Sequence, residues 1–170
     1  RKLNAKFLLM DAEQMQFPEP FDLFWSIESI SHYHDPEKFF SSSVRYLEAG
    51  GTFAMIDWFR KNALSPVQRK KYIRPIEKSM FVELHTMDDY VRYLQAAGFQ
   101  IVHREILNAH CSKTWDIALD IIKNKSLWKL AALHGKQFVH YLKGFQAMRA
   151  GYSSGNFIYG LLVAKLPEAS

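Results

Sequence analysis

The sequence contains very little cysteine. Cys111 is the only cysteine in 170 residues, which excludes an internal disulfide framework. No apolar run approaches the roughly 20 residues that a membrane-spanning helix needs, and no segment has the pattern of a signal peptide. Internal repeats, low-complexity tracts and flexible linkers are also absent from the sequence. A lone cysteine is typical of a reducing compartment, so we expect a cytoplasmic protein without a transmembrane segment.

The basic residues do not gather in long runs. The formal net charge is +5 and the isoelectric point is about 9.3, but Arg69, Lys70 and Lys71 form the only tight basic run. Scattered basic residues are typical of solvated helix faces, so we expect no nucleic-acid partner. Hydrophobic residues make up 48% and aromatic residues 15%, which indicates one globular domain with a substantial core.

Five segments have the pattern of β-strands. They are 6–10, 21–27, 52–58, 99–106 and 156–165. The second and third are nearly continuous apolar runs, which is typical of strands that are buried on both faces of a parallel sheet.

Helix signals lie between these segments. Asp35 can cap a helix that has Pro36 at its first position, and Gly50-Gly51 is expected to end that helix. The residues expected on its buried face are Phe39, Phe40, Val44 and Leu47. Thr86 and Asp89 form a capping-box pattern for a second helix, which should stop at Gly98.

This alternation predicts an α/β fold with a Rossmann-like, mostly parallel sheet. We expect one domain over residues 1–166, followed by a short tail at 167–170. Two segments interrupt the rhythm, at about 60–85 and 112–150. We expect both to be helical insertions, the second with one or two helices, that cover the ligand-binding edge of the sheet.

Four stretches together resemble a known family. They are FLLMDAEQMQFP at 7–18, FDLFWSIESISH at 21–32, LEAGGTF at 47–53 running on to Asp57-Trp58, and the closing segment 151–166. Their order and spacing resemble the tocopherol, ubiquinone and sarcosine group (methyltransferase type 11) of class I S-adenosylmethionine-dependent methyltransferases. Ala49 stands where that group usually has proline, which makes the turn less rigid.

The resemblance also implies that something is missing. The family has a Gly-rich turn after its first strand and an acidic residue at the end of its second, and neither has a counterpart here. Both would precede Arg1, and the sequence does not start with methionine. We therefore expect this chain to be the C-terminal portion of such an enzyme. It would contain the third to seventh strands and lack most of the residues that bind the cofactor.

The resemblance implies four residues that contact S-adenosylmethionine. The Asp11 carboxylate would accept a hydrogen bond from the adenine amino group, and the Ala12 N–H would reach a ring nitrogen. An aspartate that only serves its turn is the alternative. Ser26 and Ile27 mark the exit of a central strand, where their backbone would border the methionine part of the cofactor.

Residues 32–35 carry the most chemistry. Methyl transfer is an in-line displacement, and an oxygen acceptor also benefits from a base. On the family pattern His32 is the candidate base and Tyr33 a substrate contact, whereas His34 is expected to be a loop or cap residue. His32, His34 and Asp35 have side chains that can bind a metal, but no distant ligand completes the set, so we expect no metal site.

Glu28, Trp58 and Tyr141 are the other candidate substrate-binding residues. Glu28 would orient the acceptor or pair with a cation, unless it is simply a solvent-facing loop carboxylate. The aromatic residues considered for an apolar acceptor pocket, or alternatively for the core, are Trp58, Phe59, Tyr72, Tyr141, Phe145 and Tyr152. Cys111 has no recognisable catalytic partner, and we expect it to be small and buried.

The leading hypothesis is transfer of a methyl group to a small, lipophilic or phenolic acceptor. A nucleic-acid methyltransferase is disfavoured because Ser26-Ile-Glu-Ser29 replaces the usual Asn/Asp-Pro-Pro-aromatic turn. A nicotinamide-dependent oxidoreductase would need a glycine fingerprint and a Tyr-x-x-x-Lys pair, which are both absent. The remaining alternative is a non-catalytic or split α/β module that needs an N-terminal partner segment to bind cofactor. The acceptor and the oligomeric state stay open.

Overall fold

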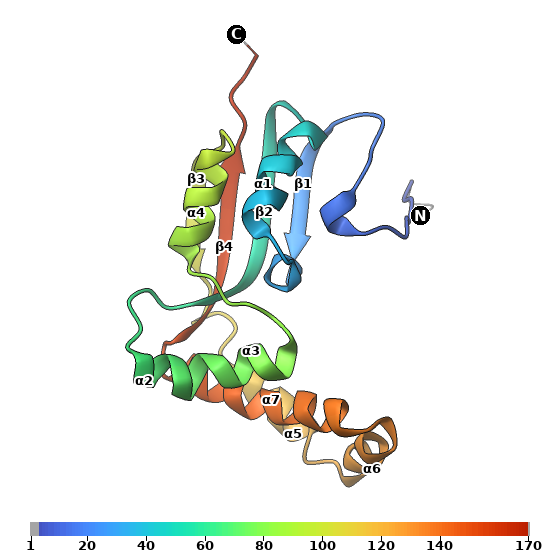
Figure 1. Cartoon of the computed structure of the whole chain (residues 1–170), viewed down its shortest axis with the longest axis vertical. Coiled ribbons are helices and arrows are strands. Elements are labelled where there is room, and N and C mark those ends of the chain that lie inside the picture. Colours follow the sequence, from blue (N-terminus) through green and yellow to red (C-terminus); the bar gives the residue numbers. More distant parts are fainter. Residues whose placement is uncertain (1–3, 170) are drawn as a thin grey trace.

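The computed structural model describes residues 4–169 (Figure 1). The first three residues of the domain expected at 1–166, and Ser170 at the end of the expected tail, lie outside the described residues. The described chain has two parts. A sheet carries two helices on one face, and a layer of helices lies beyond one end of the strands (Figure 1).

Within residues 4–169, four strands form one mixed sheet in the order β1-β2-β4-β3. The strands are β1 (Phe21–Ile27), β2 (Leu47–Arg60), β3 (Gln100–Ile106) and β4 (Phe157–Lys165). β1 and β2 are parallel, whereas β4 runs antiparallel to both β2 and β3. The prediction of a mostly parallel sheet is therefore wrong for these residues. An apolar run carries no information about the direction of its strand.

The strand expected at 6–10 does not form, because these residues pair with no strand in the described part of the chain. Phe7 is 94% exposed, and Leu9 is fully exposed. β1 is consequently an edge strand, and Leu23, Trp25 and Ile27 stay exposed on one face. An apolar run of strand length becomes a strand only beside a partner with free backbone groups.

The first long helix, α1 (Pro36–Ser43), begins where the sequence predicts. The Asp35 side chain accepts a hydrogen bond from the Lys38 N–H at 2.9 Å, and Pro36 occupies the first turn. The expected end at Gly50-Gly51 is wrong, because the helix gives way to a 3₁₀ turn (Val44–Tyr46) and β2 starts at Leu47. Both glycines therefore belong to β2, where Gly50 has a φ of +74°.

The second helix, α4 (Met87–Ala96), has the predicted capping box. The Thr86 hydroxyl accepts from the Asp89 N–H at 3.0 Å, and the Asp89 carboxylate accepts from the Thr86 N–H at 2.9 Å. α1 and α4 cover the same face of the sheet (Figure 1). The centre of this core consists of Phe40, Phe53, Met55, Phe59, Tyr90, Leu94 and Leu162.

Both segments expected to be helical insertions contain helices. They are α2 (Pro66–Gln68), a π-helical turn (Arg69–Ile73), α3 (Arg74–Met80), α5 (Thr114–Ile121), α6 (Lys125–His134) and α7 (Lys136–Ser153). The later segment thus has three helices where one or two were expected. α3 packs closely on α7 at Gly144, where a Cβ atom would collide with Ser79 and Met80.

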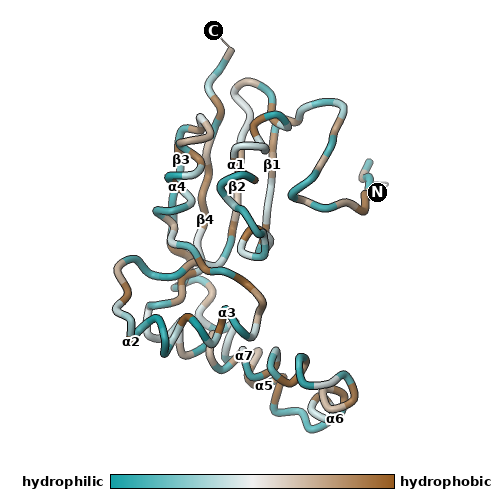
Figure 2. Tube along the Cα trace, in the orientation of Figure 1, coloured by the Kyte–Doolittle hydropathy of each residue, from teal (hydrophilic) through white to brown (hydrophobic). Residues whose placement is uncertain are grey.

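Hydrophobic residues follow β4 through the middle of the sheet, and more polar stretches alternate with apolar ones along the helical layer (Figure 2). Among residues 4–169, no helix combines the length and apolarity that crossing a membrane requires.

Candidate active site

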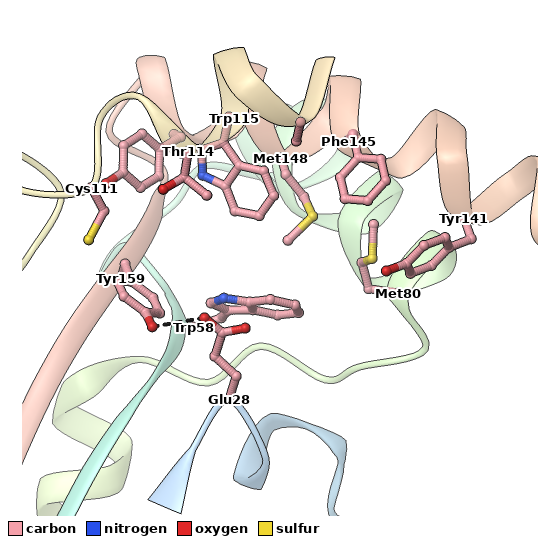
Figure 3. A pocket seen from close by; sticks show the side chains of 12 residues that line it. Glu28, Trp58, Met80, Cys111, Thr114, Trp115, Tyr141, Phe145, Met148 and Tyr159 are labelled. Carbon is pink, nitrogen blue, oxygen red and sulfur yellow. Dashed lines mark hydrogen bonds between the residues drawn. The ribbon is translucent and has the colours of Figure 1, made fainter. Parts of the chain in front are cut away.

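A cavity of about 370 Å³ lies where the ends of the strands meet the helical layer (Figure 3). β1, β2 and β4 supply one wall, and α3, α5 and α7 supply the other. Its lining consists of Glu28, Trp58, Met80, Cys111, Thr114, Trp115, Ala118, Tyr141, Phe145, Met148, Tyr152 and Tyr159. Aromatic rings and methionines dominate this list, so the cavity suits an apolar molecule that carries one polar group.

That polar group would meet Glu28, the residue just after β1. Its φ of +49° is in the left-handed region, which is unusual for a residue with a side chain. The Glu28 N–H still donates to the Ile56 carbonyl at 2.8 Å and so extends the ladder between β1 and β2 by one bond. This bend directs the carboxylate into the cavity (Figure 3).

Tyr159 holds the carboxylate from the opposite side. Its hydroxyl donates to Glu28 Oε1 at 2.8 Å, across 131 positions of sequence (Figure 3). Burial and then the hydrogen bond to Glu28 raise the pKa of Tyr159 above its ordinary value of 10.0. The phenol therefore stays protonated, and Glu28 keeps its second oxygen for a ligand.

Aromatic rings form most of the remaining wall. Trp58 meets Trp115 edge to face with 6.5 Å between ring centroids, and Tyr141 meets Phe145 in the same way at 5.3 Å. The Tyr152 hydroxyl donates to the Asn108 carbonyl at 2.6 Å, which satisfies the polar end of that side chain. Such walls exclude water and present π faces, which attract cations such as ammonium or sulfonium.

The structure brings together three of the four predicted substrate-binding residues. Glu28, Trp58 and Tyr141 all line the cavity. Tyr33 lies elsewhere, with its hydroxyl 2.8 Å from Ser29 Oγ and its ring against Phe39 in the core.

Of the other candidate aromatic residues, some line the cavity and some do not. Phe145 and Tyr152 line the cavity as well, whereas Phe59 is fully buried in the sheet core and Tyr72 is absent from the lining of this described cavity. Cys111, which was expected to be buried, is partly exposed and forms part of the wall.

His32, the predicted base, ends a 3₁₀ turn (Ile30–His32) after β1. It is exposed, and its ring centroid lies 6.3 Å from that of Trp58. Within the described chain it is therefore a neighbour of a cavity residue and does not itself line the cavity.

The Asp11 bend is tied to the loop after β1 through Glu13. Asp11 caps a short 3₁₀ helix (Ala12–Gln14), accepting from the Glu13 N–H at 2.9 Å. Glu13 then accepts from the backbone N–H groups of His34 and Asp35, each at 3.1 Å, and its carboxylate lies 3.0 Å from His34 Nδ1. Its hydrogen bond with His34 is the main cause that lowers the pKa of Glu13.

The Asp57 side chain also holds the loop after β1, through hydrogen bonds to its backbone. It is completely buried on β2, and its carboxylate accepts from the N–H groups of Ile30 at 2.9 Å, Ser31 at 3.2 Å and Trp58 at 2.7 Å. Burial is the largest effect on this group and raises the pKa of Asp57.

Ser26 and Ile27 point to opposite faces at the end of β1. The Ser26 side chain is buried toward the core, so it can meet a ligand only through its backbone, whereas Ile27 is 54% exposed. Asp11 is exposed, and its carboxylate has lone pairs beyond those used in its own turn. None of the four residues predicted to contact S-adenosylmethionine lines the described cavity.

Sequence reasoning missed Tyr159, Glu13 and Asp57. Tyr159 reaches Glu28 only through the pairing of β2 with β4, which no local pattern reveals. The sequence did contain a signal for Asp57, because it is a carboxylate within an apolar strand segment. Such a buried carboxylate needs hydrogen-bond donors close to it. Residues 4–169 contain no group of three or more His, Cys, Asp or Glu side chains that could hold a metal ion.

Comparison with known proteins finds methyltransferases that are similar in sequence. A family described as "Methyltransferase domain" matches residues 1–55. Tocopherol O-methyltransferase of Arabidopsis thaliana is 26% identical over 96% of this chain, and phosphoethanolamine N-methyltransferase 3 of the same plant is 24% identical over 96%. The chain spans 49% and 33% of these two relatives, respectively.

Solved structures show the same fold at lower identity. The cyclopropane synthase MmaA2 of Mycobacterium tuberculosis is 20% identical, with a TM-score of 0.75 over 93% of this chain and 59% of that one. Phosphoethanolamine N-methyltransferase 2 of Haemonchus contortus, solved with S-adenosyl-L-methionine, is 19% identical, with a TM-score of 0.69 over 93% and 36%. Residues 1–55 therefore match the methyltransferase-domain family, the chain is similar in sequence to these two methyltransferases over 96% of its length, and it shares the fold of the two solved structures.

Proposed function

We propose that this chain supplies the acceptor-binding part of a methyltransferase that acts on a small, lipophilic or phenolic molecule. The observation that carries the proposal is the Glu28–Tyr159 pair at one end of an aromatic cavity. A hydroxyl of the acceptor would meet the free oxygen of Glu28, and its apolar body would lie against Trp58, Trp115 and Phe145.

In this proposal Glu28 accepts the proton that an acceptor hydroxyl loses as its oxygen attacks the methyl carbon. Tyr159 stays protonated and keeps the carboxylate in place. The walls exclude water and hold the acceptor in line for displacement, which is the main source of acceleration for such a transfer. His32, exposed beside Trp58, is the competing candidate for the base.

The cofactor, when bound, supplies an electrophilic methyl group on a positively charged sulfur. Asp11 and Ala12 would hold its adenine through the carboxylate and a backbone N–H, and the backbone of Ser26 and Ile27 would border its methionine part. Glu13 keeps the first pair beside the loop that carries His34 and Asp35.

The single cysteine gives a direct test of where the acceptor binds. Cys111 lines the cavity and is partly exposed, so a maleimide should label it and a bound acceptor should protect it. We expect apolar phenols to slow labelling of the 170-residue chain by about tenfold at saturation, as measured by intact-protein mass spectrometry. The Trp115→Ala variant should lose this protection because it opens the wall. Labelling that no phenol, quinol or amine slows would contradict the proposed acceptor site.

A second candidate function is a module that needs another polypeptide to bind cofactor. The exposed apolar side chains of β1, namely Leu23, Trp25 and Ile27, favour it, because an unpaired edge strand is a surface on which another strand can add. Calorimetric titration of this chain with S-adenosylhomocysteine separates the two candidates. Undetectable binding at millimolar ligand supports the module, whereas micromolar affinity shows that the chain grips cofactor alone.

A further inference from the structure

Residues 121–167 contain no acidic side chain. The basic residues of the same stretch are Lys123, Lys125, Lys129, Lys136, Lys143, Arg149 and Lys165. The two carboxylates just before it are engaged, since Asp116 pairs with Arg149 at 2.8 Å and Asp120 pairs with Lys123 at 2.5 Å.

Three of these residues, Lys129, Lys136 and Lys143, lie on α6 and α7, which meet at Gly135 in a tip at the far end of the helical layer (Figure 1). Leu133 on α6 is 84% exposed, and Leu130, about one turn before it on the same helix, is 45% exposed. Lys129 precedes Leu133 by four residues and so lies on the same side of α6. The tip therefore presents large apolar side chains next to cations, and Figure 2 shows both kinds of residue along α6.

A groove of about 370 Å³ on one side of the tip carries more cationic groups. Its lining consists of Ala132, Gly135, Lys136, Val139, His140 and Lys143. The two lysines and the histidine there can surround an anionic group of the size of a phosphate or carboxylate.

A second groove, of about 440 Å³, lies on the other side of the tip and is more apolar. Its lining consists of Phe81, Leu130, His134, Gln137, Phe138 and Tyr141. Tyr141 also lines the candidate active-site cavity, so this groove and that cavity share one side chain.

We propose that the tip formed by α6 and the start of α7 docks on an anionic lipid surface. Leu133 and Leu130 enter the boundary between headgroups and acyl chains, and Lys129, Lys136 and Lys143 contact the headgroups. An amphipathic helix with lysines beside its apolar side chains binds membranes in this way, without spanning them. Where the proposed function holds, a lipophilic acceptor passes from the lipid along the Phe138 groove to Tyr141.

The chemistry of the tip favours lipid over nucleic acid. Nucleic-acid surfaces combine cations with polar side chains and stacking aromatics, whereas the most exposed large apolar side chain of α6 and α7 is an aliphatic leucine, Leu133. An aliphatic side chain that is almost fully exposed gains most by entering hydrocarbon.

Flotation of the 170-residue chain with vesicles tests this proposal. One set of vesicles is phosphatidylcholine alone, and in the other about a third of the lipid is phosphatidylserine. We expect at least about tenfold stronger binding to the second set, which weakens as salt is added. Leu133→Glu and the double variant Lys136→Glu/Lys143→Glu should each reduce that binding by about tenfold or more.

Two matched controls lie at the other end of the helical layer. Val67→Glu replaces an apolar side chain on α2 that is 74% exposed, and Lys70→Glu/Lys71→Glu makes the same charge change on the π-helical turn. Both should bind anionic vesicles like the unmodified chain, and circular dichroism should show all variants folded. The proposal is overturned if neutral and anionic vesicles bind equally, if the controls lose as much binding as the tip variants, or if a duplex oligonucleotide competes the chain off the vesicles.

Discussion

Glu28→Gln should lower the rate of methyl transfer by about 100-fold or more. The substitution keeps the size of the side chain, and its amide oxygen can still accept the hydrogen bond from Tyr159. It removes the negative charge and the ability to take up a proton, which are the two properties that the proposed mechanism uses. The measurement is radiolabelled methyl transfer from S-adenosylmethionine across a panel of quinols, phenols and amines.

Three further variants test whether the loss of rate comes from the proton-accepting role of Glu28. Tyr159→Phe removes only the hydroxyl that orients Glu28, so we expect a smaller loss, of about tenfold. Glu48→Gln makes the same chemical change at an exposed position of β2 and should leave the rate unchanged. His32→Ala tests the competing base. If His32→Ala abolishes transfer while Glu28→Gln retains it, the assignment of the base to Glu28 is wrong.

Asp57→Ala should cost about 3 kcal/mol of unfolding free energy. The carboxylate accepts hydrogen bonds from three backbone N–H groups, those of Ile30, Ser31 and Trp58, at a site with no solvent exposure. Removal leaves these donors buried without partners. Urea denaturation measures the loss, and Asp22→Ala, an exposed position on β1, should change stability by less than about 0.5 kcal/mol.

The charge of Asp57 gives this prediction a second signature. Burial raises the pKa of Asp57 in the folded state above its ordinary value of 3.8, so the folded protein binds this proton more tightly than the unfolded chain does. As the pH falls through the raised pKa toward 3.8, the wild-type protein should therefore gain stability relative to Asp57→Asn. Unfolding free energies of the two proteins that run parallel with pH would contradict an ionised, buried Asp57.

Local signals in the sequence predicted most of the secondary structure. β1 has the predicted bounds, and the caps at Asp35 and Thr86 form as expected. These features depend on a few neighbouring residues, because a capping side chain bonds the backbone three positions away. The errors at residues 6–10 and at Gly50 arose where the outcome depends on which strand lies alongside.

The candidate site was predictable only in part. Glu28, Trp58 and Tyr141 were identified from sequence, and they meet in one cavity. Their partner Tyr159 was not, since its strand reaches Glu28 only after α7 has returned the chain to the sheet. The same limit applies to Lys129, Lys136 and Lys143, which are scattered in the sequence and gathered at one tip by the turn from α6 to α7.

By itself the sequence determined the helix starts, the apolar strands and the resemblance to a methyltransferase. The helix starts and strands follow from residue type and spacing along a short stretch of chain, and the resemblance rests on the order of four such stretches. Only the tertiary structure decided the direction of β4, the pairing of Glu28 with Tyr159 and the burial of Asp57 beneath the loop after β1. These features join residues that are tens of positions apart, and the packing of the whole chain, which no local pattern encodes, selects them.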